Sequence, residues 1–234
     1  FIDIIDAKKA VADIAMSNTN YSYLSAFFMD LDGIVFINND PLTHFLQNII
    51  IKHSGSCIRS ADNIIASNVL CLNASVNSNG AFYFSGGSIN ITNFRIAQTN
   101  ATSGIYITGG NSILTDGISD KGIVTQLNGG NITLVNVTYP SETITASSRL
   151  IRKWHVDIQS NNDSAMVNVI DALSGFPIYS GHPQIIDLTD YLRTSNSLTL
   201  YYYNITASVP GSPEVHHVNN LRVTDNLNLR FKFR

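Results

Sequence analysis

The chain has 234 residues, of which 44% are hydrophobic and only 13% are charged, and its formal net charge is −3. An average soluble protein has about 25% charged residues, so Asn, Ser, Thr and Gly take many of the surface positions here. No Lys/Arg cluster offers a surface for nucleic acid, and no apolar run reaches the roughly 18 residues of a membrane helix. The composition therefore predicts a substantial core, no nucleic-acid partner and no membrane span.

Residues 1–19 predict a short amphipathic helix. Ile4, Ala7, Val11 and Ile14 recur at helical spacing. A solenoid needs a cover over its first coil, so we interpret this helix as an N-terminal cap; a contact helix for a neighbouring subunit is the alternative. The segment lacks the basic start and the long apolar stretch of a signal peptide. A chain that begins without Met is expected to be a processed or partial product.

Residues 20–148 contain a repeat marked by two residues. The first marker is a glycine that opens a short β-type run, at Gly33, Gly55, Gly80, Gly104 and Gly122. The second follows 13–15 residues later, at Asn48, Asn68, Asn93, Gly117 and Asn136. A period of about 20–50 residues made of short β runs is typical of a solenoid. We predict a right-handed parallel β-helix of about five to six coils, with three strands in each coil.

The second marker predicts two stacked columns. The residue after it is apolar in each unit, and these residues are expected to stack inside the solenoid about 4.8 Å apart: Ile49, Val69, Phe94, Ile118 and Val137. Asn at the bend tolerates a left-handed conformation, and its amide can bond to the amide of the next coil. Gly117 is expected to interrupt that amide stack.

The columns that follow the glycines are apolar on both sides. Adjacent strand residues face opposite sides, so one of these columns must point outward, and Phe82, Tyr83 and Tyr106 are the candidates for it. Three interpretations stay open: contact with another subunit, cover by another part of the chain, or an aromatic platform for sugars.

The two cysteines, Cys57 and Cys71, leave two alternatives. A disulfide across one coil is available in an oxidising compartment. Strand alternation places the two residues on opposite faces, which favours two buried thiols.

Eight Asn-X-Ser/Thr sequons predict an exported glycoprotein: Asn20, Asn73, Asn90, Asn100, Asn131, Asn136, Asn162 and Asn204. Asn136 also stands at a predicted bend of the solenoid, which argues against a glycan there.

Residues 149–234 have a different pattern. Trp154, Val156 and Ile158 alternate with polar residues, and so does the terminal stretch 227–234. Turn sequences separate five to seven short strands, which predicts a small antiparallel β-sandwich.

Two runs in this region carry a family resemblance. Val167–Ile178 (VNVIDALSGFPI) and Leu200–Val209 (LYYYNITASV) resemble signatures of immunoglobulin-like or CnaB-like surface modules. A β-helix followed by such a module is similar to archaeal and bacterial secreted cell-surface proteins of the pectate-lyase-like superfamily. The resemblance implies an extracellular location, in an envelope, sheath, S-layer or adhesive protein. The isopeptide bond of the CnaB relatives is not carried over, because Lys153 has no clear partner.

Catalysis is not the favoured interpretation. Asp30 and Asp32 form the best acidic pair, a weak Ca²⁺ candidate that has no base in register. No set of three or four ligands has the spacing of a zinc site. We therefore predict no enzyme and no required cofactor.

Together these observations predict a non-enzymatic structural subunit of an extracellular filament, sheath or surface layer, whose main partner is itself and which also meets cell-envelope glycans. The first alternative is an adhesin or carbohydrate-binding solenoid. The second is a polysaccharide lyase or hydrolase.

Overall fold

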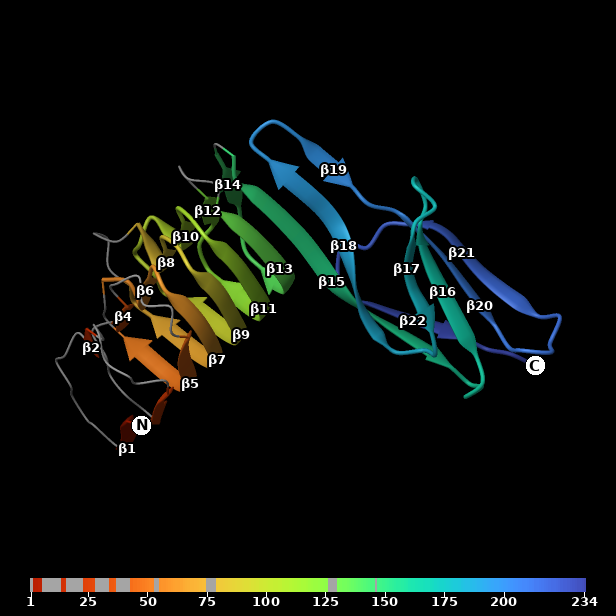
Figure 1. Cartoon of the computed structure of the whole chain (residues 1–234), viewed down its shortest axis with the longest axis horizontal. Coiled ribbons are helices and arrows are strands. Elements are labelled where there is room, and N and C mark those ends of the chain that lie inside the picture. Colours follow the sequence, from red (N-terminus) through yellow and green to blue (C-terminus); the bar gives the residue numbers. More distant parts are fainter. Residues whose placement is uncertain are drawn as a thin grey trace. The chain divides into compact units, whose positions relative to one another are not determined.

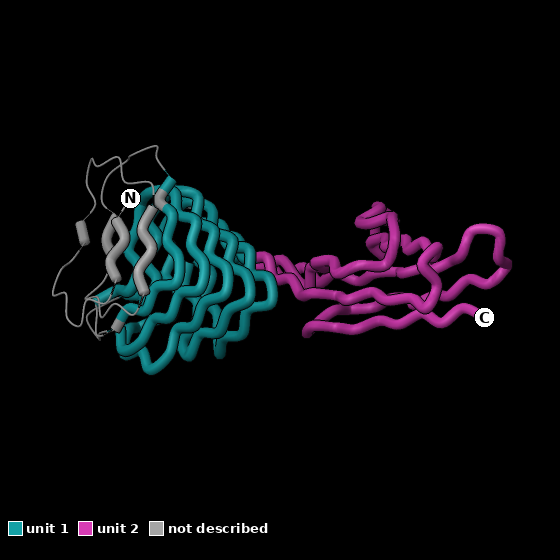
Figure 2. The backbone as a smooth tube through the Cα atoms, turned by 90° about the horizontal axis from the view of Figure 1, so that it is seen from below, with its two compact units in different colours: residues 1–150, 194–196 teal, residues 151–193, 197–234 magenta. Residues whose placement is uncertain are grey.

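A computed structural model describes most of the chain, and all regular structure in the described part is β (Figure 1). The described residues are 2–5, 14–15, 23–27, 34–36, 43–52, 55–74, 79–125, 130–145 and 147–234. They include no helix that could cross a membrane. The chain separates into two compact units (Figure 2), residues 1–150 with 194–196 and residues 151–193 with 197–234.

Unit 1 is a solenoid of two parallel sheets between which the chain alternates. The odd-numbered strands form one sheet in chain order: β1 (Ile2–Ile5), β3 (Tyr23–Phe27), β5 (Thr43–Lys52), β7 (Asn63–Leu72), β9 (Ser88–Ala97), β11 (Asn111–Ser119) and β13 (Asn131–Thr138). The even-numbered strands form the other: β2 (Ile14–Ala15), β4 (Ile34–Phe36), β6 (Ile58–Ser60), β8 (Gly80–Phe84), β10 (Ser103–Ile107), β12 (Ile123–Thr125) and β14 (Glu142–Ile144). The predicted all-β solenoid is confirmed, and its successive coils stack in Figure 2.

The number of coils and of strands per coil differs from the prediction. The solenoid has about four turns, where five to six coils were predicted. The second and third strands predicted for each coil are the two halves of one long strand, which bends at its Asn residue without leaving the sheet. Each turn therefore contributes to two sheets.

The core of unit 1 consists of columns of equivalent residues. In the even-numbered sheet Ile58, Phe82, Ile105 and Ile123 are in register, and all are completely buried. The Phe82 ring also meets the ring of Phe94 from the other sheet, with centroids 5.6 Å apart. Since a single coil cannot enclose its own apolar side, each turn depends on burial against the next one.

The predicted helical cap is absent from the described residues. Within 1–19 the described residues are Ile2–Ile5 and Ile14–Ala15, and both segments are strands. β1 pairs in parallel with β3, so that Ile2 lies opposite Leu24. β-branched isoleucine suits a strand, and pairing with the next coil satisfies its backbone, which overrides the weak helical spacing. The rest of the segment lies outside the described residues.

Unit 2 contains a four-stranded antiparallel sheet and a second group of strands. The sheet has the order β17 (Pro177–Gly181), β16 (Met166–Asp171), β20 (Tyr203–Ser208) and β21 (Val215–Leu221). The second group is β15 (Arg149–Ser160), β18 (Ile185–Thr194), β19 (Leu198–Leu200) and β22 (Leu227–Phe231). β22 pairs with β15 in parallel, which departs from the all-antiparallel prediction.

Both groups of strands contribute to one buried cluster in unit 2. Trp154, Val156 and Ile158 of β15 lie in it, as their alternation predicted, together with Tyr203 of β20. The Tyr203 hydroxyl donates to the Thr189 carbonyl oxygen and accepts from the Thr189 N–H, both at 2.9 Å. Burial raises the pKa of Tyr203 above its ordinary value of 10.0, because the charged phenolate is poorly solvated there.

Candidate functional site

The bend of each long strand carries a left-handed Asn or Asp. The corner residues are Asn48, Asn68, Asn93, Asp116 and Asn136, with φ between 53° and 56°. Asn68 Nδ2 donates to Asn48 Oδ1 and Asn93 Nδ2 donates to Asn68 Oδ1, both at 2.7 Å. The predicted amide ladder is therefore present in these coils.

The fourth corner corrects the prediction by one residue. Asp116, and not Gly117, takes the left-handed position, and Asn136 Nδ2 donates to Asp116 Oδ1 at 2.6 Å. Gly117 occupies the inward column in register with Phe94, where a Cβ atom would lie 2.0 Å from the Phe94 ring. Ile118, which was predicted inside, points outward and is 56% exposed. The glycine thus makes room for a neighbouring aromatic ring.

A groove runs along these corners across the strands β5, β7, β9, β11 and β13, and we call it the corner groove. Its volume is about 690 Å³. The corner residues, four amides and the Asp116 carboxylate, form one side, and the outward residues two positions later form the other: Ile50, Leu70, Arg95, Ile118 and Thr138. Three of these five are aliphatic. The groove is thus an elongated, mainly apolar surface with a polar edge, one cation (Arg95) and one carboxylate (Asp116).

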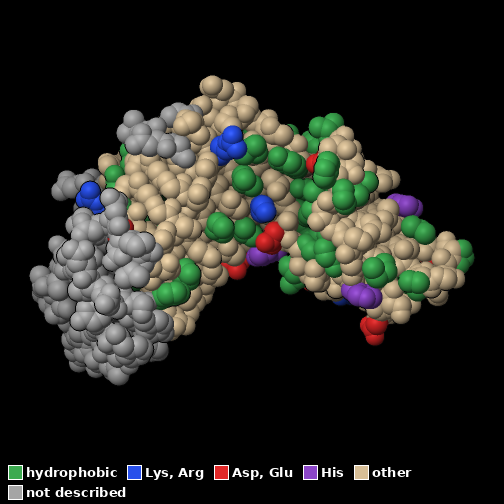
Figure 3. All heavy atoms as spheres, viewed as in Figure 1, with side chains coloured by type: hydrophobic (Ala, Val, Ile, Leu, Met, Phe, Trp, Pro, Cys, Tyr) green, Lys and Arg blue, Asp and Glu red, His purple; other side chains and the backbone are tan. Residues whose placement is uncertain are grey.

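The other half of the long strands presents a second outward column. Phe45, Ile65, Asn90, Ile113 and Thr133 are in register there. Phe45, Ile65 and Ile113 are exposed, and we call this column the Phe45–Thr133 stripe. Charged side chains are few on the face of the molecule seen in Figure 3, where hydrophobic side chains lie among polar ones.

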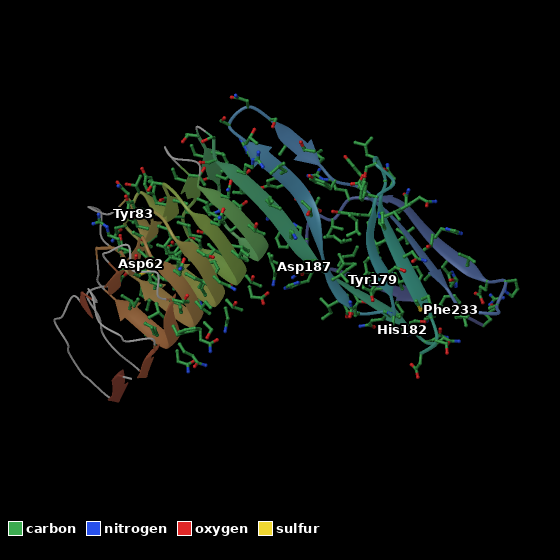
Figure 4. The ribbon with its side chains drawn as sticks, in the orientation of Figure 1. Asp62, Tyr83, Tyr179, His182, Asp187 and Phe233 are labelled. Carbon is green, nitrogen blue, oxygen red and sulfur yellow. A yellow bond between two sulfur atoms is a disulfide. The ribbon has the colours of Figure 1, made fainter. Side chains whose placement is uncertain are left out.

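The aromatic residues of the even-numbered sheet do not share one face. Phe82 is completely buried, so it is not part of a surface column. Tyr83 (Figure 4) and Tyr106 are partly exposed and stacked, with centroids 5.5 Å apart and an interplanar angle of 12°. The Arg59 guanidinium lies 5.1 Å from the Tyr83 ring centroid. Since Arg59 and Tyr106 belong to the coils on either side of Tyr83, they cover both faces of its ring, which a stacked sugar would need.

The two cysteines are joined by a disulfide. Their Cα atoms are 5.8 Å apart, and both residues are completely buried. Cys57 directly precedes β6 and Cys71 lies near the end of the next strand, β7, so the bridge joins two residues 14 apart within one coil, which is the disulfide alternative. The alternation argument for opposite faces failed because Cys57 lies in a bend directly before β6, where Cys57 and the adjacent Ile58 are both completely buried.

The sequons differ in their surroundings. Asn90, Asn100 and Asn131 are exposed, whereas Asn73, Asn136, Asn162 and Asn204 are partly buried. Asn20 lies outside the described residues, as do Asp30 and Asp32, the weak Ca²⁺ candidates. Among the described residues no three His, Cys, Asp or Glu side chains form a group that could hold a metal ion.

Unit 2 presents an apolar loop that the sequence singled out only as a family signature. The β16–β17 connection exposes Leu173 by 92% and Phe176 by 71%. The carboxylate of Asp171 organises this loop: its Oδ1 accepts from the Ser174 N–H (2.6 Å), the Ser174 hydroxyl (2.7 Å) and the Leu173 N–H (3.1 Å). The Ser174 N–H and hydroxyl bonds lower the pKa of Asp171 below its ordinary value. The loop is thus held in one conformation with its apolar side chains outward.

Comparison with known proteins gave no relative: no family model, no curated protein and no solved structure matches this chain.

Proposed function

We propose that this protein is a non-enzymatic structural subunit that works outside the cell and associates with further copies of itself into a filament, sheath or surface layer. The corner groove carries the proposal. It is a mainly apolar surface that continues over five neighbouring strands, and large exposed apolar surfaces usually mark interfaces.

The occupant we propose for the groove is the loop 171–178 of a second copy. That loop exposes Leu173, Phe176 and Ile178, which match the aliphatic lining supplied by Leu70 and Ile118. Its bonds to Asp171 keep it ordered, so little conformational entropy is lost on binding. The groove and the loop are two different surfaces. Contacts of this kind build open chains of subunits unless the rotation between successive copies closes a ring.

Two further observations support an extracellular location. The buried Cys57–Cys71 bridge fits an oxidising compartment. Eight sequons fit passage through a glycosylating pathway. The sequence also resembles archaeal and bacterial secreted surface proteins that have a right-handed parallel β-helix and an immunoglobulin-like module. We include this resemblance in the proposal because it implies the same location.

The test uses two variants that each damage one half of the contact. Ile118→Glu places a charge in the groove, and the double variant Leu173→Ser/Phe176→Ser removes the apolar loop side chains; all three positions are exposed, so folding should be retained. Thr143→Glu, at an exposed position of β14, is the matched control for the groove charge. Assembly is followed by sedimentation velocity and electron microscopy.

We expect long assemblies from the parent protein and from Thr143→Glu, and monomers from each damaged variant alone. A mixture of the two damaged variants should form dimers, because one supplies an intact loop and the other an intact groove. Monomers from the parent protein at every concentration would overturn the proposal and turn attention to glycan binding. Variants that assemble like the parent would show that other surfaces join the subunits.

A further inference from the structure

The Phe45–Thr133 stripe contains one polar residue at its centre. Asn90 lies in register between Ile65 and Ile113. Polar columns border the stripe on both sides: Asn63, Ser88 and Asn111 toward the strand starts, and Ser67, Thr92 and Thr115 toward the corner. Asn90 is thus the polar group in the middle of an exposed apolar line.

Asn90 begins a sequon with favourable geometry. Asn90 and Thr92 are both exposed on the outward face of β9, while the intervening Ile91 is completely buried. Asn136 is the contrasting sequon. It is a left-handed corner residue that lines the groove, and its Nδ2 is hydrogen-bonded to Asp116.

We infer that Asn90 carries an N-linked glycan that covers the stripe and leaves the corner groove as the open apolar surface, with Asn136 unmodified. This inference rests on the proposed export of the protein. In the reaction, Asn90 Nδ2 attacks the anomeric carbon of an oligosaccharide linked to a lipid pyrophosphate. The new C–N bond forms, the bond from that carbon to the pyrophosphate oxygen breaks, and the lipid pyrophosphate leaves. The amide proton passes to a base.

The position of Asn90 explains why a glycan there would control association. Neighbouring strands lie about 4.8 Å apart, so the first sugar stands above Ile65 and Ile113 and packs its C–H groups against them. A glycan at Asn136 would instead extend into the corner groove. It would occupy the surface proposed to bind the loop 171–178 of a second copy.

The first measurement is sequon occupancy. The whole chain is secreted from a host that attaches N-linked glycans, and peptides that contain Asn90 and Asn136 are analysed by mass spectrometry. We expect Asn90 to be modified in most molecules and Asn136 to be unmodified. Modification of other sequons with Asn90 bare, predominant modification of Asn136, or no modification at any sequon would each overturn the inference.

The second measurement tests the shielding. Asn90→Gln is compared with Asn100→Gln, which removes another exposed sequon on β9's following loop. We expect Asn90→Gln to bind roughly two- to threefold more of an apolar fluorescent dye than Asn100→Gln and to sediment as larger, laterally associated species. Equal dye binding and equal sedimentation of the two variants would overturn the shielding role. Because the groove and loop variants test the end-to-end contact separately, failure of either proposal is distinguishable from failure of the other.

Discussion

The two units stabilise β-structure in different ways. Unit 1 repeats a few devices in every coil: an inward apolar column, a left-handed corner and an amide bonded to the next corner. Unit 2 relies on interactions that occur at single places in its described structure, such as the Tyr203 hydroxyl on the Thr189 backbone and the ion pair between Arg222 Nη2 and Asp190 Oδ1 at 2.9 Å.

This contrast teaches where each unit is vulnerable. In a solenoid each coil contacts only its neighbours, so the loss of one contact is local and the remaining coils keep theirs. In unit 2 one buried cluster joins both groups of strands, so a change at one anchor is felt by the whole cluster. The single Trp of the chain, Trp154, lies in that cluster, and its fluorescence therefore reports unit 2 separately from unit 1.

The largest expected effect comes from the Cys57–Cys71 bridge within one coil. Replacement of both Cys57 and Cys71 by Ala should lower the stability of unit 1 by about 3 kcal/mol, since the unfolded chain loses a constraint between residues 14 apart. Denaturant titration followed by circular dichroism should show an earlier transition, while the Trp154 fluorescence transition stays in place. Reduction of the unsubstituted protein is the control and should act in the same way. If both transitions move together, the units do not unfold separately.

The next effect concerns the anchor of unit 2. Tyr203→Phe removes the hydroxyl and leaves the Thr189 N–H and carbonyl without that partner, which should cost about 1–2 kcal/mol. The Trp154 transition should shift to lower denaturant, and the transition of unit 1 should not. Tyr202→Phe, at the neighbouring half-buried position, is the matched control. Equal shifts for the two variants would contradict the anchoring role of Tyr203.

A third prediction separates the two roles of a corner residue. Asn68→Gly keeps the left-handed bend but removes the amide bonded to Asn48 and Asn93, and should cost about 1 kcal/mol. Asn68→Ala removes the amide and also strains the bend, and should cost about 1 kcal/mol more. Thermal unfolding of unit 1 measures both. Equal stability of the Gly variant and the parent would mean that the ladder adds nothing beyond conformation.

The smallest effect is a pH dependence of the loop 171–178. The pKa of Asp171 lies below its ordinary value of 3.8, so the folded loop binds a proton less readily than the unfolded chain. Its contribution to stability is present above that ordinary value and is lost as the pH falls through the lower, folded value. The protection of the Leu173 and Ser174 amides, measured as exchange relative to the intrinsic rate at each pH, should therefore decrease in acid. Asp171→Asn should abolish this pH-dependent loss of protection, and its persistence would assign it to another group.

Several features of the fold were predictable from sequence because they depend on local rules. The two-residue alternation located Trp154, Val156 and Ile158 on one buried face. The recurring Asn predicted left-handed corners and the amide ladder, since few other residues adopt that conformation. The repeat itself predicted a solenoid. Each of these signals lies within one coil or one strand.

Register between coils was not predictable in the same way. The number of residues between the marker glycine and the following strand is not constant. Aligning the glycines therefore placed Phe82 in the column of Tyr106, whereas Tyr83 is the residue in register with Tyr106. At the fourth corner the same alignment chose Gly117 in place of Asp116. A shift of one residue exchanges inside for outside, and this is why Phe82 and Ile118 were both assigned to the wrong side.

The sequence by itself determined the all-β solenoid, its corners and its apolar columns, because alternation and left-handed bends are properties of a few neighbouring residues. Only the tertiary structure decided which residues meet: the Cys57–Cys71 bridge within one coil, the space that Gly117 leaves for Phe94 of the neighbouring coil, the strands in place of the cap helix, and the corner groove. Those features depend on packing between different segments of the chain, where a shift of one residue exchanges a core position for a surface position.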